Sequence, residues 1–475
     1  MSHAAVLPSI IQGGMGVGVS NWMLARAVAS RGQLGVVSGT GLDTVFVRRL
    51  QDGDPGGHLR RAMAAFPVPG VAEAVMERFF RPDGRDDQEP YRLLPMYKQV
   101  VDEARHQLTA LANFVEVWLA REGHAGPVGL NLLTKIQLPN PASLYGAMLA
   151  GVDYVLMGAG IPREIPGVLD GLSRHAPVRM TLDVADLPRG RAERVCFDPS
   201  DVGGGPIPEL KRPAFLPVVS SHSLATVMAR KANGRVDGFV VEAPTAGGHN
   251  APPRGARRFN ERGEPVYGPR DEVDFAQVAA LDLPFWVAGG AGSPDGLHDA
   301  RAAGAQGVQV GTLFAYCRES GLEEAHKRRV IDAARDGGLD VVTEERASPT
   351  GFPFKVVQLE GTLSQDDVYQ QRRRRCDLGY LREAYRDHRG RVGWRCPAEP
   401  VDAFIGKGGD PADTAGRRCL CNALMANIGL GQVLADGSSE PGLFTAGDDL
   451  RVLAGFVGRR RSYSAGDVID HLLQG

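Results

Sequence analysis

Residues 285–315 read FWVAGGAGSPDGLHDARAAGAQGVQVGTLFA, and this stretch decides the fold. A short apolar run, Phe285–Ala288, ends in glycines, a helical pattern follows, and a second apolar run, Gly307–Val310, again ends in glycine. Near-continuous apolar strands are typical of parallel sheets, which are buried on both faces. The stretch therefore predicts one strand–helix–strand unit of a parallel α/β fold.

The same pattern recurs through the first two thirds of the chain. Six earlier apolar runs are bounded by Gly or Pro and mostly separated by helical patterns: Ser9–Gln12, Leu34–Ser38, Val128–Leu132, Asp153–Met157, Phe215–Val219 and Asp237–Val241. Eight strand–helix repeats predict a (β/α)8 TIM barrel. A doubly wound open sheet is the alternative, but Gly-rich loops after many strands favour the barrel. Val178–Leu182 is a weaker strand candidate between the fourth and fifth strands.

Two regions depart from the repeat and suggest the domain organisation. Residues 51–126 are too long for one crossover, and they predict a helical insertion after strand 2 that forms a cap or lid, with helices around Val71–Phe80 and Met96–Arg121. Beyond about residue 340 the alternation fades. We therefore expect a ligand-binding TIM-barrel domain over residues 1–340 and a mostly helical C-terminal extension over 341–475 that packs on it.

Composition and charge exclude several classes of function. The chain has 475 residues and a formal net charge of −2, which gives no reason to expect nucleic acid or an anionic membrane as a partner. It contains no run of about 18 apolar residues, and its first residues, MSHAAVLPSIIQ, lack a secretory pattern, so we expect a cytoplasmic protein. Six cysteines are too sparse for a disulfide scaffold. Whether the chain forms a homo-oligomer stays open.

Glycines follow the seventh and eighth predicted strands, where TIM barrels commonly bind phosphate. The seventh strand leads into Gly289, Gly290 and Gly292, and the eighth leads into Gly311 and Thr312. Glycine lets the backbone approach an anion, and free N–H groups at the start of the next helix attract it. Tight turns without a ligand are the alternative interpretation.

The first strand also ends in glycine, in the sequence Gln12–Gly16, which includes Gly14 and Met15. Small residues there leave room for a flat ring over the barrel mouth. A phosphate site on the opposite side then favours flavin mononucleotide (FMN), which has a phosphate at one end and an aromatic ring system at the other.

A lone histidine follows the sixth strand in EAPTAGGHNAPPRG, residues 242–255. This loop position places His249 at the barrel mouth, and Gly247 and Gly248 let the backbone pass close to the ring. A histidine there can move a proton or stabilise a developing negative charge. Arg254 either pairs with an anionic part of the substrate or is a solvated loop arginine.

These motifs resemble the nitronate monooxygenase (formerly 2-nitropropane dioxygenase) family of FMN-dependent barrels, which is related to flavin-type enoyl-acyl carrier protein reductases. The resemblance runs over residues 8–320 and rests on IIQGGMGVGVS, LGVVSGTG, VGLNL, PTAGGHN, FWVAGGAGSP and GVQVGTLFA. The residues Pro244–Ala246 before the Gly-Gly-His motif, and the APPRG after it, depart from the family pattern, and they leave the substrate open.

The resemblance implies a role for individual residues. His249 corresponds to the family's catalytic histidine. The FMN phosphate contacts fall on Gly290, Gly292, Gly311 and Thr312, with Gln309 in the same pocket, and the ring and ribityl contacts fall on Gly14, Met15 and Asn131. Lys135 either reaches the ring or phosphate or is a surface lysine.

Several reactions remain open at this point. Oxidation of a nitronate or similar anion with O2 is the preferred reaction, because no separate dinucleotide-binding motif is present. An NAD(P)H-dependent FMN enoyl thioester reductase of fatty-acid or polyketide-type metabolism is the second. Phosphate-binding barrels without flavin, and a non-enzymatic flavin-binding protein, are further alternatives.

The extension carries three features of its own. Its cysteines Cys376, Cys396, Cys419 and Cys421 lack a Cys-x-x-Cys pair, so we expect thiols rather than a metal site. The run Arg372–Arg375 lies in a predicted charged helix, Gln365–Tyr385, and is read as a solvated face or a binding site for phosphate or a carrier protein. Another helix is predicted at Asn422–Gly429. The segment Ser348–Lys355, SPTGFPFK, is a candidate to fold back over the barrel mouth.

Overall fold

The barrel is built from eight parallel strands. The structure, a computed structural model, describes residues 7–188, 190–203, 208–434, 436–448 and 450–474. The strands follow the order β1-β11-β10-β9-β8-β4-β3-β2, and a parallel bridge between Ile11 and Leu34 joins the two ends. Their bounds are β1 Ile10–Gln12, β2 Gly35–Ser38, β3 Val128–Leu133, β4 Tyr154–Gly158, β8 Ala214–Val219, β9 Phe239–Glu242, β10 Phe285–Ala288 and β11 Gly307–Val310. The predicted (β/α)8 barrel is confirmed.

The strands form because their side chains are buried in the barrel and against the helices. Inside, Trp286, Ile11, Val36, Leu156, Leu216 and Val240 pack as one cluster. Outside lie α1 Trp22–Ala29, α5 Glu103–Arg121, α6 Asn140–Leu149, α7 Ile165–Ser173, α8 His222–Lys231, α9 Phe275–Ala279, α10 Pro294–Ala302 and α11 Thr312–Ala315. The strand candidate Val178–Leu182 does form a strand, β5. It lies outside the barrel and pairs antiparallel with β7 Glu193–Phe197.

The insertion contributes to the outer helical layer. It includes η1 Pro55–Gly57, α3 His58–Met63 and α4 Val71–Phe79 after α2 Leu42–Gln51, and then α5, which packs against α1 and α6. The predicted helix at Met96–Arg121 is shorter at its start. Asp102 caps α5 by accepting a hydrogen bond from the Arg105 N–H at 2.9 Å, so the helix begins at Glu103.

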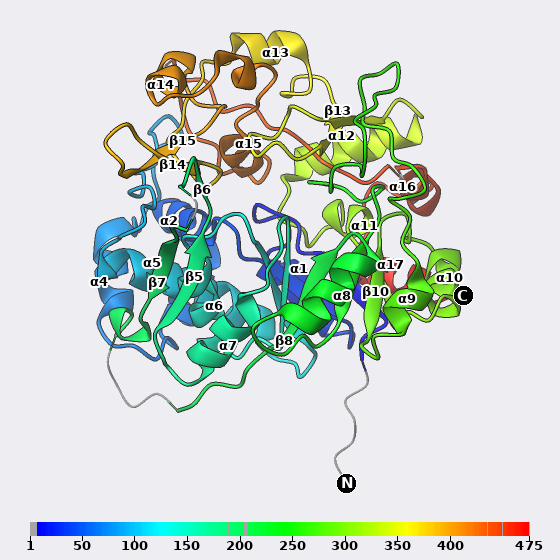
Figure 1. Cartoon of the computed structure of the whole chain (residues 1–475), viewed down its shortest axis with the longest axis horizontal. Helices are drawn as coiled ribbons and strands as arrows, with labels where there is room; N and C mark the ends of the chain where they lie inside the picture. Colours follow the sequence, from blue (N-terminus) through cyan, green and yellow to red (C-terminus); the bar gives the residue numbers. More distant parts are fainter. Residues whose placement is uncertain (1–6, 189, 204–207, 435, 449, 475) are drawn as a thin grey trace.

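Most of the C-terminal extension lies across one end of the barrel, above it in the view of Figure 1, whereas its last helix packs beside the barrel against α1 and α10. Two small sheets occur here. One pairs β12 Asp340–Glu344 with β13 Phe354–Gln358, and the other joins β14 Glu383–Arg386 to β15 Val392–Arg395 and β6 Val184–Ala185. The helices of the extension are α13 Asp366–Gln371, α14 Val401–Gly406, α15 Leu420–Ala426, α16 Leu450–Val457 and α17 Ala465–Leu473, with η3 Pro411–Thr414 as a short 3-10 turn. Before it, α12 Glu324–Arg335 follows the barrel, and a second 3-10 turn, η2 Pro199–Asp201, follows β7.

The predicted charged helix Gln365–Tyr385 is wrong beyond residue 371. The chain becomes extended at Arg372, whose side chain is buried in an ion pair with Glu440, and Arg374 donates to the carbonyl oxygens of Pro397 and Thr414. These partners bind the guanidinium groups individually, so the arginine run is not a solvated helix face. The predicted helix at Asn422–Gly429 corresponds to α15.

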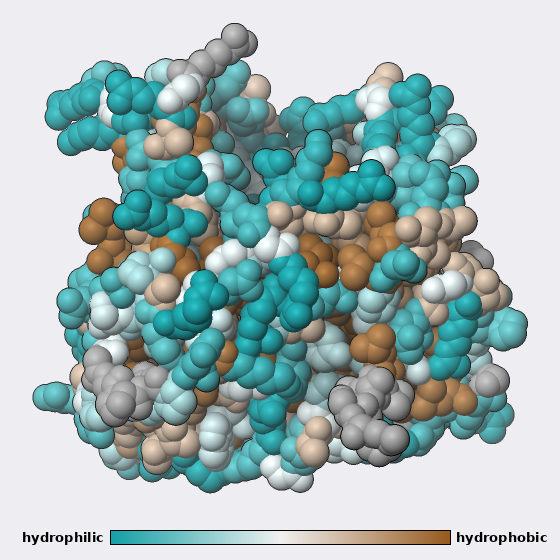
Figure 2. Space-filling view, turned by 60° about the horizontal axis from the view of Figure 1, so that its bottom comes forward, coloured by the Kyte–Doolittle hydropathy of each residue, from teal (hydrophilic) through white to brown (hydrophobic). Residues whose placement is uncertain are grey.

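The surface in Figure 2 is mainly hydrophilic, with apolar side chains in a broken band across the middle of the view. Such scattered apolar groups are ordinary on water-facing protein surfaces. Among the described residues, no helix has both the length and the apolar character that a membrane crossing requires.

Candidate functional site

A cavity of about 290 Å3 lies at the end of the barrel where the strands finish. The loops after β1, β9, β10 and β11 line it, as do residues of the extension. Twelve of the predicted site residues are brought together on its walls: Gly14, Met15, Asn131, Gly247, Gly248, His249, Gly289, Gly290, Gly292, Gln309, Gly311 and Thr312. Lys135 and Arg254 do not line it.

The loop after β1 is held close to β3. Nδ2 of Asn131 donates to the carbonyl oxygen of Gly14 at 2.8 Å, and a Cβ added at Gly14 would lie 2.2 Å from the Cβ of Asn131. The backbone of Met15 is fixed from the other side, because its N–H donates to Oγ of Ser20 at 2.9 Å. Only glycine at position 14 therefore allows this close approach.

The loops after β10 and β11 together form a glycine cradle on the cavity wall. Within the described residues, no hydrogen bond to a protein atom engages the backbone N–H groups of Gly290, Ala291 or Gly292. Gly289 and Gly290 have φ angles of +90° and +74°, which glycine adopts without strain. Oγ1 of Thr312 lies at the same end and accepts a hydrogen bond from the Gly447 N–H at 3.0 Å. Unpaired N–H groups in a glycine loop fit a phosphate, as FMN requires.

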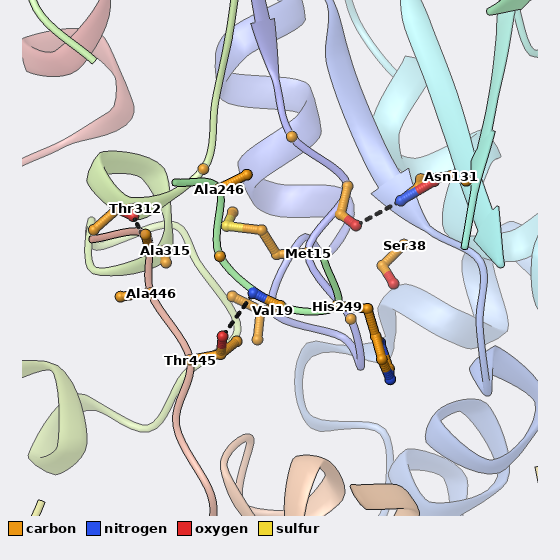
Figure 3. Close-up of a pocket in the computed structure, with 18 of the residues that line it drawn as sticks. Met15, Val19, Ser38, Asn131, Ala246, His249, Thr312, Ala315, Thr445 and Ala446 are labelled. Carbon is orange, nitrogen blue, oxygen red and sulfur yellow. Dashed lines mark hydrogen bonds between the residues drawn. The ribbon is translucent and has the colours of Figure 1, made fainter. Parts of the chain in front are cut away.

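His249 lies on the opposite side of the cavity from Thr312 and Ala446 in the view of Figure 3. Its Nε2 is 2.7 Å from Oγ of Ser348, and its ring contacts the Phe354 ring edge-on, with centroids 4.9 Å apart. Burial, and then the positive charge of Lys135, hold the pKa of His249 well below its usual value. The imidazole is therefore uncharged at neutral pH. No group of the described residues bonds its Nδ1, so this nitrogen can serve a ligand.

Glu242, the last residue of β9, is a second titratable group on the cavity wall. Its carboxyl makes no ion pair or hydrogen bond with the side chains that the structure describes. Burial raises the pKa of Glu242 to about 7. Sequence analysis overlooked this residue, although it opens the stretch that contains His249.

The extension supplies the rest of the wall. Oγ1 of Thr445 accepts a hydrogen bond from the Gly248 N–H at 2.8 Å, and the Asp448 N–H donates to the carbonyl oxygen of Thr245 at 3.0 Å (Figure 3 draws the first). Further lining residues from this part are Tyr380, Cys421, Leu424, Asn427, Phe444 and Ala446. No motif marks them in the sequence, because their place depends on how the extension folds over the barrel.

The segment Ser348–Lys355 returns to the barrel mouth, as expected. The N–H of Lys355 donates to the carbonyl oxygen of Gly248 at 3.0 Å, and the N–H of Asn250 donates to that of Pro353 at 2.9 Å. Lys135 meets this segment rather than the cavity. Its Nζ donates to Oγ1 of Thr350 at 3.0 Å and lies 3.6 Å from the centroid of the Phe352 ring.

Arg254 is committed to backbone partners. Its guanidinium donates to the carbonyl oxygens of Ser220 and Arg270, both at 3.1 Å, and its side chain is exposed. The structure therefore does not bring Arg254 to the cavity with His249.

The four cysteines of the extension gather around one small cavity with Ala398: Cys376, Cys396, Cys419 and Cys421. Burial raises the pKa of each thiol, so all four stay protonated at neutral pH. Over the described part of the chain, no three His, Cys, Asp or Glu side chains are placed to hold a metal ion.

The family model and the curated relatives that match this sequence are all nitronate monooxygenases. A family model for nitronate monooxygenase matches residues 206–348. A probable nitronate monooxygenase of Bacillus subtilis (strain 168) is 31% identical over 127 residues, which cover 27% of this chain and 35% of that protein. A nitronate monooxygenase of Paraburkholderia phytofirmans is 32% identical over 138 residues, which cover 27% of this chain and 34% of that protein. These matches thus span about a third of each curated relative.

Two solved structures are also similar. FabK from Thermotoga maritima aligns with a TM-score of 0.48 at 16% sequence identity, and the alignment covers 99% of this chain and 92% of the FabK chain. Nitroalkane oxidase from Streptomyces ansochromogenes aligns with a TM-score of 0.44 at 17% sequence identity, and the alignment covers 98% of this chain and 95% of the oxidase chain. The resemblance inferred from the motifs is confirmed by the family model and the curated relatives. The residues that the family model matches, 206–348, include His249 and both glycine loops of the cradle.

Proposed function

We propose that the protein is an FMN-dependent oxidoreductase that oxidises nitronates, or the neutral nitroalkanes from which they form, with O2 as the electron acceptor. The observation that carries this proposal is the pairing of His249, an uncharged imidazole with a free ring nitrogen, with a cradle of unpaired N–H groups in the same cavity. A neutral imidazole can take the α-proton of a nitroalkane, and its N–H form can donate a hydrogen bond to a nitronate. The family match over residues 206–348 supports the same chemistry.

The residues present fit FMN. Its phosphate would be held by Gly290, Gly292, Gly311 and Thr312, and its ribityl chain and ring would lie against Gln309, Gly14, Met15 and Asn131, with room left by Gly247, Gly248 and Gly289. When bound, FMN accepts electrons from the substrate and passes them to O2, and the products are a carbonyl compound and nitrite. The extension adds apolar side chains such as Leu424 and Phe444 to the cavity wall, and an apolar wall of this kind favours the displacement of water by a bound ligand.

The proposal assigns a role to each part of the chain. Residues 1–340 are the FMN-binding barrel, and residues 341–475 complete the substrate wall. Residues 51–126 do not line the cavity, but they hold the extension in place. The Tyr91 N–H donates to Oε1 of Gln432 at 2.8 Å, and Arg382 donates to the carbonyl oxygen of Tyr97 at 2.6 Å.

Anaerobic mixing of the FMN-loaded protein with substrate tests the proposal. We expect a small alkyl nitronate, and more slowly its parent nitroalkane, to bleach the flavin absorbance without any nicotinamide. Admission of air should restore the absorbance and release nitrite. Rapid bleaching by NADPH, with none by the nitronate, would contradict the proposal and assign the protein to the enoyl reductase type. If the purified protein takes up no FMN, the assignment of FMN as its cofactor is wrong.

A further inference from the structure

Four polar side chains form a continuous line of hydrogen bonds that leads away from the cavity. Nε2 of His249 is 2.7 Å from Oγ of Ser348, and Oγ of Ser348 is 2.8 Å from Oγ1 of Thr350. The line ends at Lys135, whose Nζ lies 3.0 Å from Oγ1 of Thr350. It joins the loop after β9, the extension and the loop after β3, so no single segment of the sequence contains it.

The line lies in a largely apolar environment. Ser348 is fully buried, and the rings of Phe352 and Phe354 lie against Lys135 and His249 respectively. Burial lowers the pKa of Lys135 to about 7, and burial together with Lys135 lowers the pKa of His249. No carboxylate contributes to either shift. Among the described residues, Arg417 is the other charged group that bonds to the line, through donation from its guanidinium to the backbone carbonyl oxygen of Ser348. Glu242 lies on the same cavity wall as His249, but it has no hydrogen bond to the line.

Two hydroxyl groups in series can point in one of two directions. Each hydroxyl has one hydrogen, so a hydroxyl that donates to one neighbour in the line accepts from the other. A charged Lys135 can only donate, and it therefore directs Thr350 to donate to Ser348, and Ser348 to donate to Nε2 of His249. A neutral Lys135 has a lone pair and can accept, which allows the whole line to reverse, with His249 donating from Nε2 to Ser348.

We propose that the charge on Lys135 selects, through Thr350 and Ser348, which ring nitrogen of the uncharged His249 carries the proton. With Lys135 charged, Nδ1 carries a hydrogen and donates to an anion in the cavity. With Lys135 neutral, Nδ1 has a lone pair and acts as a base. This inference deepens the proposed function and rests on it for the identity of the ligand, whereas the coupling itself belongs to the protein alone.

The two states correspond to the two sides of a proton transfer. When Nδ1 takes the α-proton of a nitroalkane, the Nε2 proton passes to Ser348, the Ser348 proton to Thr350, and the Thr350 proton to Nζ of Lys135. The C–H bond breaks, an N–H bond forms on Lys135, and the electron pair stays on the substrate, which becomes the nitronate. His249 is left neutral with a hydrogen on Nδ1, in position to bond that anion.

The test is nitrogen NMR of the cofactor-free protein labelled with 15N in its histidine rings. The His249 signals are assigned by their loss in His249→Gln. In the wild type we expect the protonated nitrogen to change from Nδ1 to Nε2 as the pH rises through about 7, the pKa of Lys135. His249 stays uncharged throughout this change.

Thr350→Val keeps the side-chain shape but interrupts the line, and Thr350→Ser restores the hydroxyl as its matched control. We expect the pH-dependent change from the Nδ1–H to the Nε2–H form of His249 to vanish in Thr350→Val and in Lys135→Met, and to persist in Thr350→Ser. If folded Thr350→Val or Lys135→Met shows the same pH-dependent change of tautomer as the wild type, the inference is overturned. A single His249 tautomer at every pH in the wild type would overturn it as well. If Thr350→Val does not fold, Lys135→Met decides. Since no flavin or substrate is present, this result is independent of whether the protein oxidises nitronates.

Discussion

Nε2 of His249 lies 2.7 Å from Oγ of Ser348, a residue 99 positions further along the chain and outside the barrel strands. The candidate catalytic histidine is thus positioned from two sides. The loop after β9 carries the backbone of His249, and the extension supplies Ser348, the hydrogen-bond partner of Nε2. The free nitrogen, Nδ1, remains for the ligand.

Replacement of His249 by glutamine should separate the two substrates. A neutral nitroalkane needs a base, so we expect kcat/KM for it to fall about 10^2–10^4-fold, the usual range for a lost general base. The preformed nitronate has already lost its α-proton and should be affected less. Stopped-flow flavin reduction with both substrates measures the difference, at matched FMN content. Equal losses for both would mean that His249 holds the substrate without taking a proton.

Thr312→Val should weaken the binding of FMN but not that of riboflavin. The Thr312 oxygen accepts from the Gly447 N–H, so its hydroxyl hydrogen is left for a phosphate oxygen. A hydrogen bond to a charged group contributes about 1.5–3 kcal/mol, which corresponds to about a 10–150-fold loss of FMN affinity. Titration of flavin fluorescence with FMN and riboflavin measures this, and Thr312→Ser is the control. A parallel loss for both flavins would contradict a phosphate contact.

Gly247→Ala should push the extension away from the barrel. The added Cβ would lie 2.8 Å from the carbonyl carbon of Ala446 and 2.9 Å from the Gly447 nitrogen, and both are backbone atoms that cannot rotate aside. Overpacking of this kind costs about 1–3 kcal/mol. We expect a lower free energy of unfolding in denaturant titrations and weaker FMN binding. Gly406→Ala, where an added Cβ meets nothing within 4 Å, is the control. Equal stability of the two variants would show that the extension does not press on Gly247.

Glu242 should make the stability of the cofactor-free protein depend on pH. Its pKa is about 7 in the folded protein against 4.5 for the free group, so the folded state binds more protons between these values. The free energy of unfolding therefore falls as the pH rises through this window, and it stays lower above it. Glu242→Gln should remove this fall and be more stable than the wild type at about pH 8. Thermal melts on both sides of the window measure it, and identical pH profiles would show that Glu242 is solvated.

The barrel and most of its glycine sites could be predicted because their signals are local. Each barrel strand is a short apolar run that ends in Gly or a polar loop, and the loops of Gly289–Gly292 and Gly311 follow directly from the strands. The contacts of Thr445 and Ser348 could not be predicted in this way, because they depend on a fold in which distant segments meet. For Lys135 the sequence left open a contact with the ring or phosphate and a surface position, and no pattern reveals its bond to Thr350.

The errors have a similar physical origin. A run of arginines is typical of a solvated helix, yet Arg372 is buried because Glu440 neutralises it. The helix expected there would have kept these side chains in water. The ion pair with Glu440, 68 residues further along the chain, therefore outweighs the helix propensity of the arginine run.

The closure of the cavity by the extension also sets an order of assembly. During translation the ribosome completes the barrel through β11 before Ser348 and Thr445 are made. A nascent chain at that stage holds His249 and the glycine loops, but it has neither the hydroxyl beside the histidine nor the last wall of the cavity. The glycine cradle is thus synthesised first, while it is still open to solvent, and His249 obtains its partner only when the extension has folded over the barrel.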